Sequence, residues 1–189
     1  MVETRAGGTP ERSFTYKQIN EASNILGHLV KSGIQTEDVV MIYSHRGVDL
    51  VVAVMGILKA GATLPGLDPV YPPDRQNIYL EVAKPSAQVV IAKATQEAGE
   101  ISETVRAFIS ANLKLRIEVP GLALRGDGSL IGGDVAGRDV LASVEHLGIS
   151  SLGVAVGPDS TPPLSFISGS EEKPKGVRGR HFSLACYFG

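Results

Sequence analysis

An alternation of short apolar runs with helical patterns is the feature that most constrains how this chain folds. Residues 39–43 are apolar and rich in β-branched side chains, as is typical of a strand buried on both faces of a parallel sheet. Further strands are predicted at residues 63–67, 89–92, 115–119 and 164–167. Because strands and helices alternate, we expect an α/β domain with a mostly parallel sheet and helices on both faces. Ligands are then expected beyond the carboxyl ends of the strands.

Four helices are predicted before and between these strands. Thr15 and Gln18 have the spacing of a capping box, in which each side chain satisfies a free backbone N–H of the other residue. Gly33 supplies a left-handed stop, so the first helix is predicted over residues 16–32. The other helices are predicted over residues 48–59, 72–82 and 97–111.

Two further stretches depart from the alternation. Residues 121–137 contain six glycines among acidic and polar side chains, which is typical of a surface loop. Residues 182–188 are apolar again where the chain stops, with nothing left to bury them. We therefore expect a polar lead-in over residues 1–13 and a domain over residues 14–189 that is truncated at its C-terminal end.

Composition and charge exclude several classes of function. A chain of 189 residues with 43% hydrophobic and 20% charged residues matches a globular domain rather than a disordered one. Its net charge of −2 gives no broad basic field, so neither nucleic acid nor an anionic membrane is expected as a partner. The one cysteine, Cys186, forms no internal disulfide and has no metal-binding spacing around it. We expect Cys186 to be an inert core residue and the protein to be cytoplasmic.

A segment rich in hydroxyl groups, glycine and lysine follows the last predicted strand. Glycine allows backbone N–H groups to fold around an anion, and Ser168 and Ser170 add hydroxyl donors. Lys173 and Lys175 supply positive charges, while Pro174 stiffens the return. This composition suits a phosphate site, although by composition alone an exposed turn with solvated lysines is the more common arrangement.

The order of residues in this segment resembles the signature loop of the adenylate-forming superfamily, Y-T-S-G-[ST]-T-G-x-P-K-G-V. In that superfamily the loop holds the β- and γ-phosphates of ATP while a carboxylate attacks the α-phosphate. The coinciding positions are Ser168, Gly169, Ser170, Pro174, Lys175, Gly176 and Val177. The residues that the resemblance implies for ATP binding are Ser168, Gly169, Ser170, Lys173, Lys175 and Gly176. His181 is implied as support for the loop.

The positions at which the loop differs from the superfamily pattern include Ile167, Glu171 and Glu172. Ile167 and Glu171 replace threonines, and Glu172 replaces a glycine. Glutamate disfavours a positive φ angle, and a carboxylate about 4 Å from a phosphate charge costs on the order of 4 kcal/mol at an effective dielectric constant of about 20. Lys173 is expected to offset part of this cost.

Two upstream segments resemble the same superfamily. Residues 58–75 match the pattern L-K-A-G-x-x-x-x-x-[IL]-D-P-x-Y-P-x-x-R throughout. Here Asp68 enters a proline-fixed turn and Arg75 lies one turn into the next helix, so we expect the two side chains to pair, in a structural role. Residues 14–24 and 39–59 together resemble the start of the domain.

Two pairs of residues beside the predicted strands have open interpretations. His45 and Arg46 follow the strand at residues 39–43, where they either form a solvated loop pair or face a ligand cleft. Pro65 and Gly66 are unusual inside a short strand and indicate an edge strand or a bulge.

Four shorter segments resemble the family of fungal α-aminoadipate reductases in particular. They are residues 41–50, 71–79, 156–160 and 179–184. That family implies adenylation of the side-chain carboxylate of 2-aminoadipate with ATP and Mg²⁺, as the first step of its reduction to the semialdehyde in lysine biosynthesis. Capture as a phosphopantetheine thioester and reduction by NADPH follow in carrier and reductase domains of the same polypeptide, after action of a phosphopantetheinyl transferase.

The resemblance places this chain as the N-terminal subdomain of an acetyl-CoA-synthetase-like fold. The catalytic lysine, the adenine motif and most of the substrate pocket are implied to lie beyond Gly189, so no catalytic residue and no metal ligand is expected in this chain. Alternatives are an adenylation fragment of peptide synthetase or acyl-CoA ligase type, with another carboxylate substrate, and a catalytically inactive fragment that keeps only the fold. A nicotinamide-binding domain is disfavoured because no G-x-G-x-x-G follows a strand.

Overall fold

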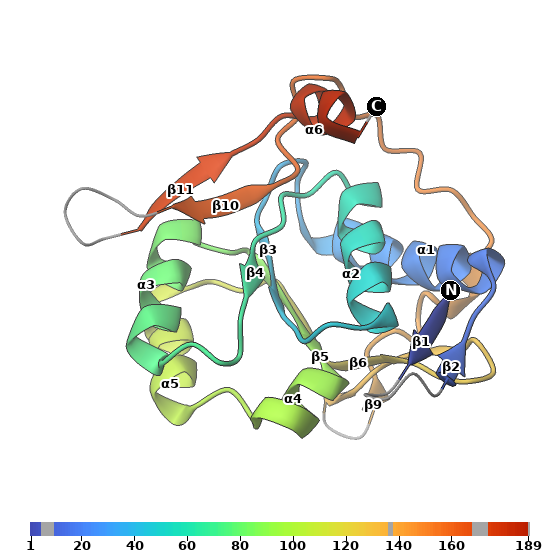
Figure 1. The fold of residues 1–189 in the computed structure, drawn as a ribbon, viewed down its shortest axis with the longest axis horizontal. Coiled ribbons are helices and arrows are strands. Elements are labelled where there is room, and N and C mark those ends of the chain that lie inside the picture. The colour runs from blue at the N-terminus through green and yellow to red at the C-terminus, as the bar shows by residue number, and fades with distance from the viewer. Residues whose placement is uncertain (5–9, 136–137, 168–173, 189) are drawn as a thin grey trace.

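The structure is a computed structural model that describes residues 1–4, 10–135, 138–167 and 174–188 (Figure 1). Its centre is a five-stranded sheet with the strand order β4-β3-β5-β6-β7, in which all neighbours are parallel except β6 and β7. The strands are β4 (Gly66–Leu67), β3 (Val40–Tyr43), β5 (Ala87–Ile91), β6 (Ile117–Leu124) and β7 (Leu130–Gly132). The predicted α/β architecture is confirmed.

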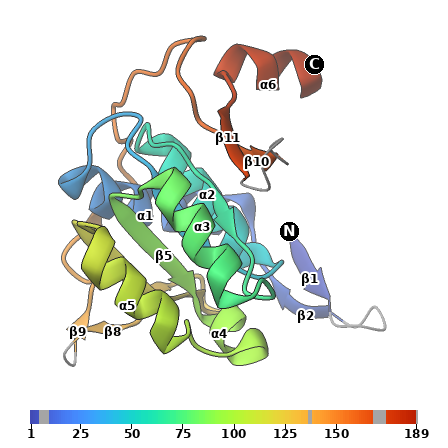
Figure 2. The ribbon, with the colours of Figure 1, turned by 90° about the vertical axis from the view of Figure 1, so that its left-hand side faces the viewer.

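Helices cover both faces of this sheet (Figure 2). One face carries α1 (Tyr16–Gly33) and α2 (Val48–Lys59), and the other carries α3 (Pro73–Ala83) and α5 (Glu103–Asn112). The short helix α4 (Ala92–Ala98) follows β5 directly. All four residues of β3 are buried, because helices cover both sides of the strand. None of the helices within the described ranges is long and apolar enough to cross a lipid bilayer.

The capping box predicted for the first helix is present. Thr15 Oγ1 accepts a hydrogen bond from the Gln18 backbone N–H at 3.2 Å, and Gln18 Oε1 accepts one from the Thr15 backbone N–H at 2.9 Å. Helix α1 packs closely on α2 at Gly56, where a Cβ atom would lie 2.9 Å from the Ser23 carbonyl oxygen. The two helices therefore form one closely packed layer on the sheet.

Three predictions from composition and periodicity are wrong. Residues 121–137 are not one loop, because β6 continues to Leu124 and pairs antiparallel with β7, and the leucines of this pair are buried. The helix predicted over residues 97–111 is instead α4 and α5, separated by Gly99 at φ +88° and by Ser102, which caps α5. Cys186 is exposed rather than part of the core.

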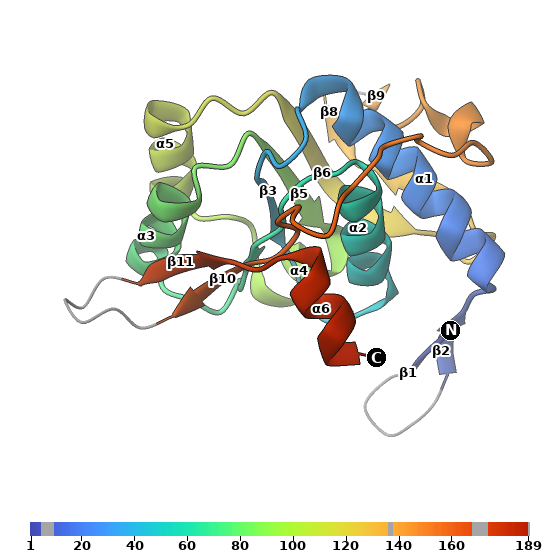
Figure 3. The same ribbon diagram turned by 90° about the horizontal axis from the view of Figure 1, so that it is seen from above.

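A separate hairpin lies above the sheet (Figures 1 and 3). The predicted strand at residues 164–167 is present as β10 (Leu164–Ile167), which pairs antiparallel with β11 (Lys175–Arg178) rather than joining the parallel sheet. The Leu64 carbonyl oxygen accepts a hydrogen bond from the Leu164 N–H at 3.2 Å and so links the hairpin to the region of edge strand β4. Helix α6 (His181–Phe188) follows β11.

Short elements complete the described chain. The N-terminal ribbon pairs β1 (Val2–Thr4) with β2 (Pro10–Ser13), and a second ribbon pairs β8 (Asp134–Val135) with β9 (Arg138–Asp139). A single 3₁₀ turn, η1, spans Glu145–Leu147. The N-terminal ribbon is tied to the sheet body, since Arg12 reaches the carboxylate of Asp49 at 2.7 Å on α2.

Candidate functional site

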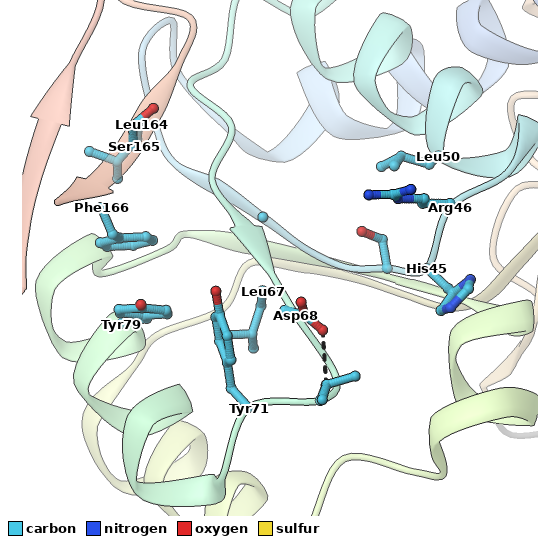
Figure 4. A pocket seen from close by; sticks show the side chains of 13 residues that line it. His45, Arg46, Leu50, Leu67, Asp68, Tyr71, Tyr79, Leu164, Ser165 and Phe166 are labelled. Atoms are coloured by element: carbon cyan, nitrogen blue, oxygen red, sulfur yellow. Dashed lines mark hydrogen bonds between the residues drawn. The ribbon is translucent and has the colours of Figure 1, made fainter.

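A cleft of about 500 Å³ lies at the carboxyl ends of β3 and β4, where the sheet analysis places ligands (Figure 4). The residues that follow β3 and β4 form two walls of the cleft, and strand β10 of the hairpin forms the third wall. Its lining residues are Ser44, His45, Arg46, Leu50, Gly66, Leu67, Asp68, Val70, Tyr71, Tyr79, Leu164, Ser165 and Phe166. The cleft therefore joins the upstream superfamily segments to the strand that leads into the signature loop.

The β3 side of the cleft supplies two cationic or protonatable groups. His45 Nδ1 lies 3.0 Å from Glu97 Oε2 on α4, which fixes the imidazole at the rim. Arg46 lines the cleft and makes no hydrogen bond or ion pair with any residue that the structure describes. A guanidinium without a partner among the described residues is suited to bind a phosphate or a carboxylate. Of the two interpretations of this pair, the structure supports the one in which it faces a cleft.

The β4 side of the cleft is an ordered acidic turn. Asp68 Oδ1 accepts a hydrogen bond from the Val70 backbone N–H at 2.9 Å (dashed line, Figure 4), which fixes the turn after β4. The predicted pair of Asp68 with Arg75 is not formed. The Arg75 guanidinium lies over the ring of Tyr71, with 4.1 Å from Cζ to the ring centroid, and its Nε donates to Tyr79 Oη at 3.0 Å.

A buried tyrosine, Tyr43, ends strand β3. Burial raises the pKa of the Tyr43 phenol, and the carboxylates of Glu100 and Asp68 raise this pKa further. Its hydroxyl donates to the Gly99 carbonyl oxygen at 3.2 Å. Tyr43 thus stays a neutral donor that holds the start of the α4–α5 connection.

Lys59 of the L-K-A-G segment points away from the cleft, toward α1. Its Nζ donates to Ser23 Oγ at 2.6 Å and to Asn24 Oδ1 at 2.7 Å. Burial lowers the pKa of this ammonium group. This lysine joins α2 to α1, which agrees with the structural role expected for the segment.

The hairpin side of the cleft rests on α3. The ring of Phe166 lies parallel to that of Tyr79, with centroids 4.2 Å apart and an interplanar angle of 7° (Figure 4). Gly176 is the register partner of Phe166, and a Cβ atom at Gly176 would lie 3.2 Å from Val82 Cγ1 on α3. Glycine at this position therefore has a packing reason, because it lets β11 approach the helix.

The structure locates only some of the residues implied for ATP binding. Lys175 is exposed at the start of β11, and Gly176 faces α3. His181 begins α6, and its backbone N–H donates to the Ser160 carbonyl oxygen at 2.9 Å. The other implied residues, Ser168, Gly169, Ser170 and Lys173, lie outside the described residues, as do Glu171 and Glu172.

The cleft residues that sequence reasoning missed include Tyr79 and Phe166. Tyr79 and Phe166 were treated as part of a helix and a strand, without a role in the site. The signal for Tyr79 was its spacing, because Arg75 and Tyr79 stand four residues apart and so share one face of α3. Phe166 carried no such signal, since its partner is distant in sequence.

The sequence matches known proteins over nearly its whole length. The model of the family described as AMP-binding enzyme matches residues 3–188. The L-2-aminoadipate reductase large subunit of Penicillium chrysogenum is 66% identical over the whole chain, and the L-2-aminoadipate reductase of Schizosaccharomyces pombe is 59% identical over 95% of it. The chain spans 13% and 12% of the length of these two relatives.

The chain also matches more distant proteins. A dimodular nonribosomal peptide synthase of Bacillus subtilis is 31% identical over 99% of the chain, which spans 7% of that protein. Among solved structures, ATP-bound MatB from Rhodopseudomonas palustris superposes with a TM-score of 0.63 at 19% identity, covering 96% of this chain and 32% of that one. This structural likeness shows the fold.

Proposed function

The chain belongs to the AMP-binding enzyme family, and we propose that it is the front part of an adenylation unit that activates the side-chain carboxylate of L-2-aminoadipate with ATP. The observation that carries this proposal is the identity of 66% and 59% with two L-2-aminoadipate reductases over nearly all of the chain. The peptide synthase shares only 31% over the same length. The proposed substrate follows the names of the two more similar relatives.

The cleft chemistry supports an anionic ligand. Arg46 offers a guanidinium without a described partner, and Lys175 offers an exposed ammonium group on the hairpin that forms the third wall. Asp68 is the one carboxylate among the lining residues, and its Oδ1 is engaged by the Val70 N–H. We propose that Ser168, Gly169, Ser170, Lys173, Lys175 and Gly176 hold the ATP phosphates.

The proposed reaction is a nucleotidyl transfer. A carboxylate oxygen of the substrate forms a bond to the α-phosphorus of ATP, and the bond from that phosphorus to the bridging oxygen of pyrophosphate breaks. Pyrophosphate leaves, and the mixed anhydride of aminoadipate and AMP remains. Positive groups at the β- and γ-phosphates lower the barrier because charge accumulates on the leaving pyrophosphate, and Mg²⁺ bound with ATP has the same effect.

The later steps of the proposed function belong to other parts of a longer cytoplasmic protein. We propose that residues 14–189 are an incomplete adenylation domain, continued by a second subdomain, a carrier domain and a reductase domain. A phosphopantetheine thiol on the carrier then captures the adenylate as a thioester, and NADPH reduces it to the semialdehyde. The short share of the relatives that the chain spans supports this division.

The test is substrate-dependent exchange of labelled pyrophosphate into ATP by the full-length protein that the reading frame encodes. We expect exchange with L-2-aminoadipate and at least about tenfold less with L-glutamate, because the missing methylene removes contacts in the pocket. Exchange with another carboxylate but not with aminoadipate would overturn the substrate. A reading frame that ends at Gly189 would overturn the division into domains.

The isolated 189 residues provide a second test. We expect no exchange from them with any carboxylate, because the lysine and the nucleotide-binding segments that the family uses lie outside the chain. Steady turnover by the isolated chain, retained after a second chromatographic step, contradicts this expectation.

A further inference from the structure

A stack of aromatic and cationic side chains joins α3 to the hairpin beside the cleft. Tyr79 is 6% exposed, and its ring contacts two other aromatic rings. Phe166 lies parallel to it at 4.2 Å, and Tyr71 meets it edge-on with centroids 5.4 Å apart and planes at 74°. Arg75 donates from Nε to the Tyr79 hydroxyl at 3.0 Å. The ring is thus fixed in position and in orientation.

The stack is built almost entirely from one short segment. Tyr71 precedes α3, and Arg75 and Tyr79 occupy positions four residues apart on the helix, so they share one face. Helix α3 is itself part of the layer that covers the sheet (Figure 2). The platform on which Phe166 rests is therefore set by the sheet body and not by the hairpin.

Backbone hydrogen bonds of Leu64 with Pro162 and Leu164 join the start of the hairpin to the region of β4, and the described hairpin residues bury few side chains. All four residues of β11 are exposed, and Leu164 is the one buried residue of β10. Phe166 and Gly176 are register partners, so they face the same side, which is the side of α3. Because Gly176 has no side chain, Val82 of α3 can lie close to β11. The phenyl ring of Phe166 stacks on the ring of Tyr79.

Phe166 stands two residues before Ser168, the first residue of the proposed phosphate-binding group. We propose that Tyr79 is a positioning residue, which through its stack on Phe166 holds the hairpin, and with it Lys175 and Gly176 of the proposed phosphate-binding group, against α3. This proposal rests on the proposed function of the chain. Tyr79 has no proposed contact with substrate and acts through Phe166.

The first experiment separates positioning from general stability in the full-length protein. We expect Tyr79→Leu to raise the KM for ATP about tenfold in pyrophosphate exchange, because small misplacements of binding groups have large kinetic effects. The KM for L-2-aminoadipate stays unchanged, and Tyr79→Phe, which keeps the ring, restores the KM for ATP. Tyr16→Leu is the matched control, since Tyr16 is 83% exposed on α1.

The second experiment is a double-mutant cycle of Tyr79→Leu with Phe166→Leu. If Tyr79→Leu does not fold, the Phe166→Leu variant alone still tests the positioning role. If the two rings act through their contact, the double variant raises the KM for ATP no further than either single variant. Multiplying effects, or an unchanged KM for ATP in a folded and active Phe166→Leu variant, overturn the positioning role. Absence of aminoadipate-dependent exchange in the unmodified protein would instead overturn the proposed function.

Discussion

The sheet body and the β10–β11 hairpin differ in what holds them. The body is held by burial, since β3 is covered on both faces and α1 and α2 approach each other at Gly56. The hairpin is largely exposed and is held by backbone hydrogen bonds near β4 and by the contact of Phe166 with Tyr79. Substitutions in the body should therefore change global stability, whereas substitutions in the hairpin should change position and ligand binding.

The largest effect is expected at the ion pair that joins the N-terminal ribbon to the body. Asp49 is 2% exposed, and its carboxylate accepts from Arg12 Nη2 at 2.7 Å and from the Leu124 N–H at 2.7 Å. Asp49→Ala should lower the free energy of unfolding by about 3 kcal/mol, because the buried Leu124 N–H loses its acceptor and the Arg12 guanidinium loses its carboxylate partner. Urea unfolding of the chain measures this.

Asp159→Ala is the matched control for that variant. Asp159 pairs with Arg180 at 2.8 Å, but its side chain is exposed, so solvent screens the pair. No measurable loss of stability is expected. Equal losses in the two variants would show that the Arg12–Asp49 pair does not tie the ribbon to the body.

The next effect concerns the packing of the two helices on one face of the sheet. Gly56→Ala should cost about 2 kcal/mol of stability, because the new Cβ would lie 2.9 Å from the Ser23 carbonyl oxygen and the helices would have to separate. Gly66→Ala is the control, since nothing lies within 4 Å of a Cβ there. A stable Gly56→Ala variant would mean that the body is less tightly packed than the structure shows.

A smaller effect is expected at the start of α1. Thr15→Ala removes the side-chain acceptor for the Gln18 N–H and should cost about 1 kcal/mol. Thr15→Ser keeps the hydroxyl oxygen and should retain most of the stability. Thermal unfolding of the unmodified chain, Thr15→Ala and Thr15→Ser measures these differences in stability. A Thr15→Ser variant as unstable as Thr15→Ala would count against the capping box.

The smallest effect on global stability is expected in the hairpin. Phe166→Leu should lower the free energy of unfolding by less than about 1 kcal/mol, because one ring contact at a partly exposed site is lost. Amide hydrogen exchange should nevertheless become faster in β10 and β11 while β3 keeps its protection. Equal acceleration in β3 would remove the distinction between the two regions.

Local signals in the sequence predicted the body well. The capping box at Thr15 and the apolar run that became β3 are determined by neighbouring residues, and both are present. The pair β6–β7 was missed because its glycines suggested a loop, although Leu122, Leu124 and Leu130 mark the buried face. The glycine content therefore favoured a loop, although the order of the residues contains the alternation of buried and exposed side chains that is typical of a strand.

Tertiary partners were beyond the reach of the sequence. Arg75 was expected to pair with Asp68, but it lies over the ring of Tyr71 and bonds to Tyr79 instead. The family resemblance indicated which loop to consider, while the support of that loop by α3 became visible only when Phe166 and Tyr79 were brought together. Such contacts depend on distant residues that no local pattern encodes.

The central claim is that the hairpin carries the residues that bind the ATP phosphates. Substitutions of Lys175 and of Arg178 in the full-length protein test this claim most directly. Lys175 and Arg178 are both exposed cations of β11, at opposite ends of the strand. The KM for ATP in aminoadipate-dependent pyrophosphate exchange should rise about a hundredfold in Lys175→Ala, as expected for loss of a charge at the phosphates, and stay unchanged in Arg178→Ala. An unchanged KM in Lys175→Ala, or equal increases in both variants, would contradict the claim.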